Sequence, residues 1–494
     1  MAVSTSLQLE QTPAERLRWQ SVTLAWTSLL FVLFPVLASL GLFMRAYQAN
    51  LFPRLDPAWF YTAMTLHGLG MVGLWYTTSF AGMAYLVARY VRMKAGVMWL
   101  SFTMTLAGVV LLLVACAVRF SPGWYFLYPL PFKSGGTWPA WATDVFLATL
   151  LVLGVAWILW ILHLLWAIAH RYALSQALCW HYLRNATQPE VPPVVLVSTV
   201  SGIASLTALL AAVILLVFLG LERLLGIPAD PLLMKNLTFY FGHTLINVAM
   251  YQGVAIIYEL FPRYTGLPWK TAKPMVIGWN AVMVLVMFAF FHHLYMDFVQ
   301  PRAVQVIGQI ASYSSALPAA VVTILGLLAQ VYHRKVRWTL ASVLMFAGTM
   351  GWAIGGTAAV IDSTIVVNFR FHNTQWVPAH FHTYLLIGLV LIVLGFTAHF
   401  TQEVSGEPER SRISKAIATL WLLGGYGFVS LFYIGGWHSV PRRYAGYPRE
   451  VAEGSLYARL ALMLVLPLIL ALLIYIWEVG KRWLAAYAAA RRPS

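Results

Sequence analysis

The sequence predicts an all-α polytopic membrane protein with twelve transmembrane helices. Of its 494 residues, 61% are hydrophobic and only 10% are charged, whereas soluble domains carry about 25% charged and 45–50% apolar residues. Twelve spans of about 24 residues would use about 290 residues, which is close to the whole hydrophobic inventory. This composition excludes a soluble globular enzyme, a disordered chain and a coiled coil.

Twelve apolar runs, each bounded by charged residues, Pro or Gly, are long enough to cross a bilayer. A polar stretch precedes the first run, and the loop at 119–141 is long and rich in aromatic residues, Gly and Pro. Because no low-complexity linker or separate soluble domain interrupts the runs, we expect residues 1–494 to form a single domain. The runs span residues 21–44, 59–88, 96–118, 142–169, 193–221, 235–261, 274–296, 305–332, 338–361, 374–401, 415–435 and 456–480.

Lys and Arg residues indicate the orientation of these spans. With the N-terminus in the cytoplasm, 20 of the 32 Lys and Arg residues fall on the cytoplasmic side, in agreement with the positive-inside rule. Twelve spans then return the C-terminus to the cytoplasm. The net charge of +16 is therefore attributed mainly to topology, with membrane lipid as the expected surroundings and no nucleic-acid partner. The two cysteines, Cys116 and Cys179, form no paired motif for a metal or a disulfide.

Histidines concentrate at one depth of the predicted bundle. An ionisable residue inside a bilayer is costly and is a functional candidate by default, although any single one could be a hydrogen-bonded core histidine. Six of the 13 histidines fall in the outer part of their runs, whichever direction the run takes. This shared depth favours a function over six separate structural roles. The six are His67, His243, His292, His293, His380 and His382.

The spacing of these histidines indicates metal binding. His380 and His382 are about 200° apart around a helix and point to opposite sides, so one helix could serve two metal centres. His292 and His293 are about 100° apart, and both could reach one metal if the helix loosens there. Neutral imidazole suits copper, iron and zinc. Two histidines can hold a haem iron from both sides, whereas one leaves a face open for substrate.

Five segments together resemble subunit I of the haem–copper oxidase superfamily. They are TLHG (Thr65–Gly68), YFGHTLIN (Tyr240–Asn247), FHH (Phe291–His293), HNTQWVPAHFH (His372–His382) and VPRR (Val440–Arg443). The resemblance covers nearly the whole chain and is greatest to the B-type branch, the ba-type oxidases. It implies the twelve-helix subunit I architecture, a prokaryotic cell membrane and an active site toward the outer side.

The resemblance also implies a role for each histidine. His67 and His382 would be the axial ligands of a low-spin haem, expected to be of b type. His380 would be the proximal ligand of a high-spin haem of b or a type. Three histidines, His243, His292 and His293, would hold copper B. Non-haem iron is the alternative metal.

The resemblance also places four residues outside the runs near the haem propionates. Arg442 and Arg443 would pair with propionates, because a guanidinium fork suits a carboxylate; the alternative is ordinary outer-surface charge. His372 would lie near the propionates of the high-spin haem, together with Asn373.

The sequence departs from the oxidase pattern at the active-site tyrosine. In the B-type oxidases that this chain resembles, a redox-active tyrosine stands four residues after the first copper histidine. Here that position is Asn247. The C-type branch takes its tyrosine from six residues before the HH pair, where this chain has Val286. Tyr251 and Tyr295 are not obvious replacements. An amide cannot form a stable radical, so Asn247 is the residue that puts dioxygen reduction in doubt.

The departure favours nitric oxide reduction, with dioxygen reduction to water by a B-type cytochrome c oxidase as the alternative. Joining two NO molecules takes two electrons and two protons, which two reduced metals and the solvent could supply without a tyrosine. We therefore expect catalytic roles for Asn247, His243 and His380. A twelve-helix transporter is a third possibility, but no internal repeat supports it.

Protons and electrons must reach the site from elsewhere. Tyr258 and Ser312 fall where a B-type proton path is expected, although Val254 and Gln309 interrupt its pattern, and ordinary interhelical polar contacts are the alternative. Proton translocation is therefore in doubt. The chain has no cupredoxin pattern and no CxxCH motif. A partner subunit II with a dinuclear copper site or haem c is implied, fed by a soluble cytochrome c or a cupredoxin-type donor.

Overall fold

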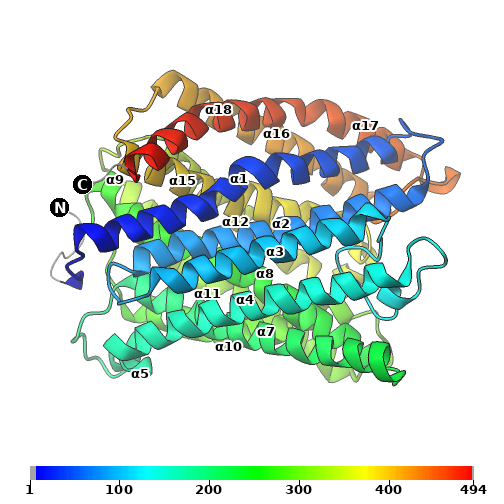
Figure 1. The fold of residues 1–494 in the computed structure, drawn as a ribbon, viewed down its shortest axis with the longest axis horizontal. Coiled ribbons are helices and arrows are strands. Elements are labelled where there is room, and N and C mark those ends of the chain that lie inside the picture. The colour runs from blue at the N-terminus through cyan, green and yellow to red at the C-terminus, as the bar shows by residue number, and fades with distance from the viewer. Residues whose placement is uncertain (1–6, 492–494) are drawn as a thin grey trace.

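The computed structural model describes residues 7–491, and its regular structure is helical throughout (Figure 1). Long helices run roughly along the longest axis of the molecule, and both ends of the chain lie at the same end of the bundle. The principal helices are α1 (Pro13–Gln48), α2 (Pro57–Val87), α3 (Ala95–Ala117), α4 (Ala140–Arg171), α7 (Pro193–Leu225), α8 (Pro231–Leu260), α10 (Lys273–Ala289), α11 (Arg302–Val331), α12 (Leu340–Asp362), α14 (Trp376–Tyr384), α15 (Val390–Ser405), α16 (Ser411–Trp437), α17 (Glu453–Leu464) and α18 (Leu466–Ala489).

Twelve long helical segments correspond to the twelve predicted runs, because α14 and α15 form one segment and α17 and α18 form another. Eleven of the segments are long and apolar enough to cross a membrane. The twelfth is α2, which has a comparable length of 31 residues. The all-α prediction is confirmed, and the fold is that of an integral membrane protein.

Several helices extend past their predicted boundaries for local reasons. Helix α1 begins at Pro13 because Thr12 and Glu15 form a capping box, in which the Glu15 N–H donates to Thr12 Oγ1 at 3.2 Å and the Thr12 N–H donates to Glu15 Oε2 at 2.9 Å. Helix α7 continues to Leu225 and ends at Gly226, whose φ of 69° suits a glycine cap.

Two of the long segments change their helical type near the predicted site. Helix α10 tightens into the 3₁₀ helix η3 (Phe290–Leu294), which carries His292 and His293. Between α14 and α15, residues Leu385–Leu389 form the π-helical segment η4. Such irregular turns occur frequently at functional sites.

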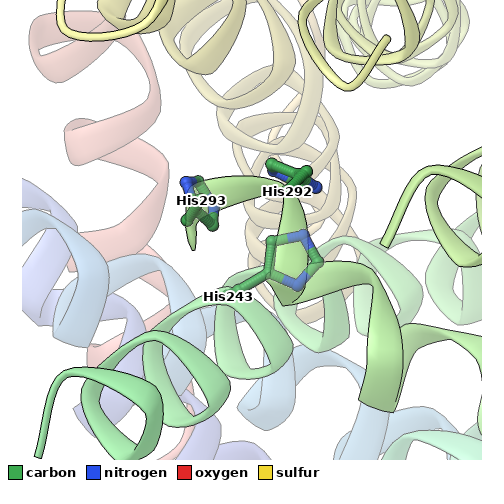
Figure 2. A group of neighbouring side chains, drawn as sticks. All are labelled: His243, His292 and His293. Atoms are coloured by element: carbon green, nitrogen blue, oxygen red, sulfur yellow. The ribbon is translucent and has the colours of Figure 1, made fainter. Parts of the chain in front are cut away.

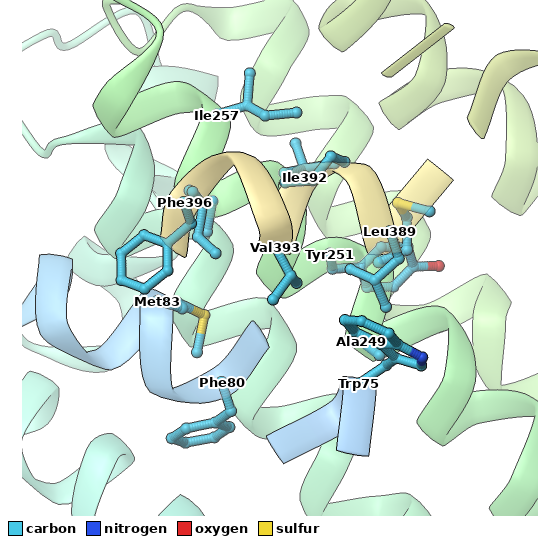
Figure 3. Packing of buried hydrophobic residues seen from close by; sticks show 14 of the residues in the cluster. Trp75, Phe80, Met83, Ala249, Tyr251, Ile257, Leu389, Ile392, Val393 and Phe396 are labelled. Carbon is cyan, nitrogen blue, oxygen red and sulfur yellow. The ribbon is translucent and has the colours of Figure 1, made fainter. Parts of the chain in front are cut away.

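Small residues allow α12 to approach this π-helical segment closely. A Cβ atom at Gly351 would lie 2.2 Å from the carbonyl oxygen of Ile387, and one at Gly348 would lie 2.8 Å from that of Gly388. Close backbone contact through small residues is a common way for membrane helices to associate. Figure 3 shows the adjoining apolar core, where side chains of α2, α8 and α15 pack together.

The loop after α16 is tied to the start of α14 by a short antiparallel bridge between Thr374 and Pro441. The Gln375 N–H donates to the Val440 carbonyl at 2.9 Å, and the Arg442 N–H donates to the Asn373 carbonyl at 2.8 Å. This bridge holds the VPRR segment next to the residues that precede the histidines of α14.

Candidate functional site: a histidine-lined cavity

A cavity of about 940 Å³ runs through the bundle, and its walls include all six histidines singled out in the sequence. This volume is at the upper end of the range of about 300–1,000 Å³ that is usual for ligand sites. Most of the wall is apolar, and arginines lie in it as well. The cavity therefore combines room for large ligands with convergent metal-binding groups.

His67 of α2 and His382 of α14 face each other across part of the cavity. Their ring centroids are 6.4 Å apart, and the rings are nearly parallel at 20°. Two metal–nitrogen bonds of about 2 Å each, together with the distance from each nitrogen to its ring centre, span roughly this gap. The pair thus has the spacing that one iron atom between two axial imidazoles requires.

Backbone carbonyls fix the orientation of both rings. His67 Nδ1 lies 2.8 Å from the Leu37 carbonyl oxygen, and His382 Nδ1 lies 2.7 Å from that of Pro378. Because a carbonyl can only accept, each Nδ1 carries the proton and each Nε2 keeps its lone pair for a metal. Gly41 of α1 makes room for this arrangement, since a Cβ there would lie 2.9 Å from His67 Cε1.

His380 faces a different helix from His382, as their spacing predicts. Its Nδ1 lies 3.6 Å from Asp362 Oδ2 at the end of α12. That distance is longer than a hydrogen bond. His382 instead stacks on Phe432 of α16, with centroids 5.4 Å apart. One helix therefore presents two imidazoles to two separate parts of the cavity.

Three further histidines gather at one point of the cavity wall (Figure 2). His243 comes from α8, whereas His292 and His293 come from η3, and one nitrogen of each lies within 4.8 Å of the others. His292 and His293 are adjacent in a 3₁₀ turn and leave the backbone about 120° apart, yet their ring centroids are only 4.2 Å apart. The three rings form a set suited to a single metal ion.

The hydrogen bonds of these rings indicate which nitrogens are free for a metal. Ser312 of α11 donates to the Gly308 carbonyl at 2.6 Å, so its hydroxyl accepts from His292 Nδ1 at 3.0 Å and leaves Nε2 free. Asn247 Nδ2 lies 3.3 Å from His243 Nε2. His243 Nδ1 is buried without a partner. An orphaned buried nitrogen calls for a ligand, so this observation fits a bound metal.

Two arginines of the loop after α16 lie against the same cavity. Arg442 donates to Asn373 Oδ1 at 2.9 Å, and Arg443 packs on the Tyr125 ring with its Nε and Nη2 atoms buried and unpartnered. Burial and the adjacent Arg443 lower the pKa of Arg442, and burial together with Arg442 lowers the pKa of His372 to about 4. Two neighbouring guanidiniums, of which Arg443 has unmet N–H groups, fit anionic propionates.

Sequence reasoning missed one cavity arginine. Arg45 of α1 is buried, lines the cavity and lies over the Phe432 ring, with 4.2 Å between its guanidinium carbon and the ring centroid. Its Nε and Nη2 atoms also lack partners. The signal that could have identified it was an arginine placed directly at the end of the apolar run 21–44.

Sequence reasoning also missed the tyrosine nearest to Asn247. The Tyr384 hydroxyl donates to Asn247 Oδ1 at 3.1 Å, and both residues line the cavity. The two tyrosines considered from the sequence lie elsewhere: Tyr251 packs against Trp279, and Tyr295 donates to the Ser363 carbonyl at 3.0 Å. A phenol therefore does reach this part of the cavity, from α14.

The two residues predicted for a proton path have separate partners. Tyr258 shares a hydrogen bond of 2.6 Å with Thr323, whereas Ser312 bonds to His292 and to backbone carbonyls. Ser312 thus directly supports a histidine of the triad. The path itself stays a prediction.

Comparisons with known proteins agree with this geometry. A family model described as cytochrome c and quinol oxidase polypeptide I matches residues 21–473. Cytochrome c oxidase subunit 1 of Thermus thermophilus is 24% identical over 448 residues, which are 85% of this chain and 75% of that protein. Cytochrome c oxidase subunit 1 of Bacillus subtilis is 25% identical over 282 residues, which are 54% of this chain and 44% of that protein.

A solved structure shows the same fold. The cryo-EM structure of a heme-copper terminal oxidase dimer superposes with a TM-score of 0.76 at 19% identity, covering 98% of this chain and 85% of that one. Because the family model extends over nearly the whole chain, the resemblance noted from the sequence is confirmed, and this protein belongs to the haem–copper oxidase subunit I family.

Proposed function

We propose that this protein is the catalytic subunit of a respiratory complex that reduces nitric oxide to nitrous oxide. Its family membership makes it an enzyme of the haem–copper oxidase superfamily. The observation that carries the finer proposal is Asn247, which stands four residues after His243 and contacts its ring. In oxidases of the B-type branch, which the sequence resembles, this place belongs to a redox-active tyrosine.

The cofactors follow from the family and from the placement of the histidines. We assign His67 and His382 to a low-spin haem of b type, His380 to a high-spin haem of b or a type, and the His243 triad to copper B. Three imidazoles without a carboxylate favour copper over non-haem iron. When bound, these groups supply the electrons of the reaction. Arg442, Arg443 and His372 would hold the propionates.

The stoichiometry of nitric oxide reduction suits the residues of this cavity. Two NO, two electrons and two protons give one nitrous oxide and one water, so no side chain needs to be oxidised. In this assignment the chain's own residues orient the two metal centres and admit protons. Tyr258 and Ser312 are retained as candidate members of an inner proton path.

Dioxygen reduction to water is the second candidate function. It is favoured by the names of the relatives, which are cytochrome c oxidases, and by Tyr384, whose phenol lies at the cavity wall. In that case the complex would act as a B-type cytochrome c oxidase with proton translocation.

The proposal includes a partner and a location. Subunit I of this family normally pairs with a subunit II, and we propose one that carries a dinuclear copper site or haem c and accepts electrons from a cytochrome c or a cupredoxin. We place the single-domain chain in a prokaryotic cell membrane, with the cavity toward the outer side and both termini in the cytoplasm.

Turnover of the purified complex with each gas tests the proposed function. The reduced complex should consume NO much faster than dioxygen and should release one nitrous oxide for every two NO molecules. NO and dioxygen electrodes, with gas chromatography of the product, make the measurement. Rapid dioxygen consumption with negligible NO consumption would overturn the proposal in favour of the oxidase.

A further inference from the structure

We propose that Tyr384 is a positioning residue of the triad metal site, acting through Asn247 on His243. The Tyr384 hydroxyl, the Asn247 amide and the His243 ring form one connected chain across two helices, α14 and α8. This inference rests on the proposed metal site at His243, but it does not depend on which gas is the substrate.

The hydrogen bonds determine the direction of the amide. A carbonyl oxygen only accepts, so the Tyr384 O–H donates to Asn247 Oδ1 at 3.1 Å. Asn247 Nδ2 then faces His243, lying 2.8 Å from its carbonyl oxygen and 3.3 Å from Nε2. The hydroxyl can donate to the amide oxygen or, if the amide turns over, accept from its nitrogen, so in either orientation it keeps the amide against the imidazole.

The amide in turn occupies one side of His243. With Nε2 against Asn247, the unpartnered Nδ1 is left for the triad site. Because a neutral imidazole has one N–H and one lone pair, a metal on Nδ1 requires the proton on Nε2, where the amide oxygen accepts it once the amide has turned over. Groups that orient a metal-binding imidazole are part of the site's affinity, and their loss typically weakens metal binding about 10–100-fold. Tyr384 is therefore expected to influence metal binding without contacting the metal.

The backbone of Tyr384 is itself held in place. A Cβ atom at Gly355 of α12 would lie 2.5 Å from the Tyr384 nitrogen and 2.7 Å from its Cα atom. The π-helical segment η4 begins at the next residue. The close contact and the change of helical type together fix the position of the Tyr384 backbone along the cavity wall.

Removal of the hydroxyl tests the inference on the intact complex. Tyr384→Phe keeps the ring but removes the donor, so we expect copper affinity to fall about 10-fold, measured by competition with a copper(I) chelator. The infrared band of carbon monoxide bound to the reduced copper should shift or split, since the imidazole is no longer held in one orientation. Neither readout depends on turnover.

Two further variants separate positioning from general damage. Tyr433→Phe is the matched control, because Tyr433 shares its 3.1 Å hydrogen bond with Thr383 and lies outside the cavity wall; it should leave copper affinity and the infrared band unchanged. Asn247→Ala should reproduce the effect of Tyr384→Phe, and the double variant should add nothing further, since both changes break one chain.

The outcomes distinguish this inference from the proposed function. Wild-type affinity and an unaltered band in Tyr384→Phe would overturn the inference, as would a full additional effect of Tyr384→Phe in the Asn247→Ala background. A wild-type complex without copper at the triad would overturn the metal assignment and this inference together. A complex that reduces dioxygen rather than NO, but shows the expected copper effects, would overturn only the proposed substrate.

Discussion

For several histidines of this protein, the hydrogen-bond partner of one ring nitrogen decides whether the other nitrogen is free to bind a metal. His67 and His382 donate Nδ1–H to backbone carbonyls, and His292 donates to a serine hydroxyl. The remaining nitrogen of each ring is thereby left for a metal. Side-chain identity alone could not separate these three histidines from the other ten, because the distinguishing partner is a neighbouring atom of the folded chain.

Replacement of one histidine of α14 should remove one haem and spare the other. In His380→Ala we expect loss of the high-spin haem and its carbon monoxide complex, with most of the low-spin signal retained, because His382 and His67 still face each other. Reduced-minus-oxidised optical spectra and haem extraction make the measurement. If only the low-spin signal disappears, the roles of His380 and His382 are reversed.

At the scale of elements, the apolar runs predicted the helices well but not the irregular turns within them. Hydrophobicity extends across Leu385–Leu389 without interruption, yet this stretch is π-helical and lies against glycines of α12. The partnership between Tyr384 and Asn247 was also invisible in the sequence, because 137 residues separate them. Only the folded chain brings the phenol of Tyr384 to the amide of Asn247.

The contact between α12 and η4 leads to a prediction about stability. Gly351→Ala would place a methyl group 2.2 Å from the Ile387 carbonyl oxygen, so α12 must move away, at a cost of about 1–3 kcal/mol. We expect a lower unfolding temperature and disturbed haem spectra in the purified complex. Gly356→Ala is the control, since a Cβ there meets nothing within 4 Å. Equal unfolding temperatures for the two variants would contradict this account.

For the whole molecule, the sequence predicted the all-α fold class, which the structure confirms, and six histidines at one depth, all of which line one cavity. Their shared depth was the informative signal, because helices of alternating direction bring residues of one depth together. Arg45 escaped notice because it directly follows the apolar run 21–44, and Tyr384 because a phenol inside an apolar run gives no distinct signal. Membrane orientation stays a prediction from charge.

Orientation can be tested because both native cysteines, Cys116 and Cys179, are buried and give little background labelling. The loop between α3 and α4 lies at the opposite end of the bundle from the loop between α15 and α16 (Figure 1). Lys133 and Glu407 are exposed residues of these two loops. With the termini in the cytoplasm, Lys133→Cys should react with a membrane-impermeant maleimide on intact cells.

Glu407→Cys should react only after the membrane is opened, because it would lie on the cytoplasmic side with the excess of Lys and Arg. The reverse pattern would place the histidine-lined cavity toward the cytoplasm. Electrons from a soluble donor outside the cell membrane could not then enter beside Arg442 and Arg443, and the proposed partner would be excluded along with the orientation. If the introduced cysteines of Lys133→Cys and Glu407→Cys were both labelled on intact cells, the membrane would have been breached. A labelled cytoplasmic marker protein would reveal such a breach independently.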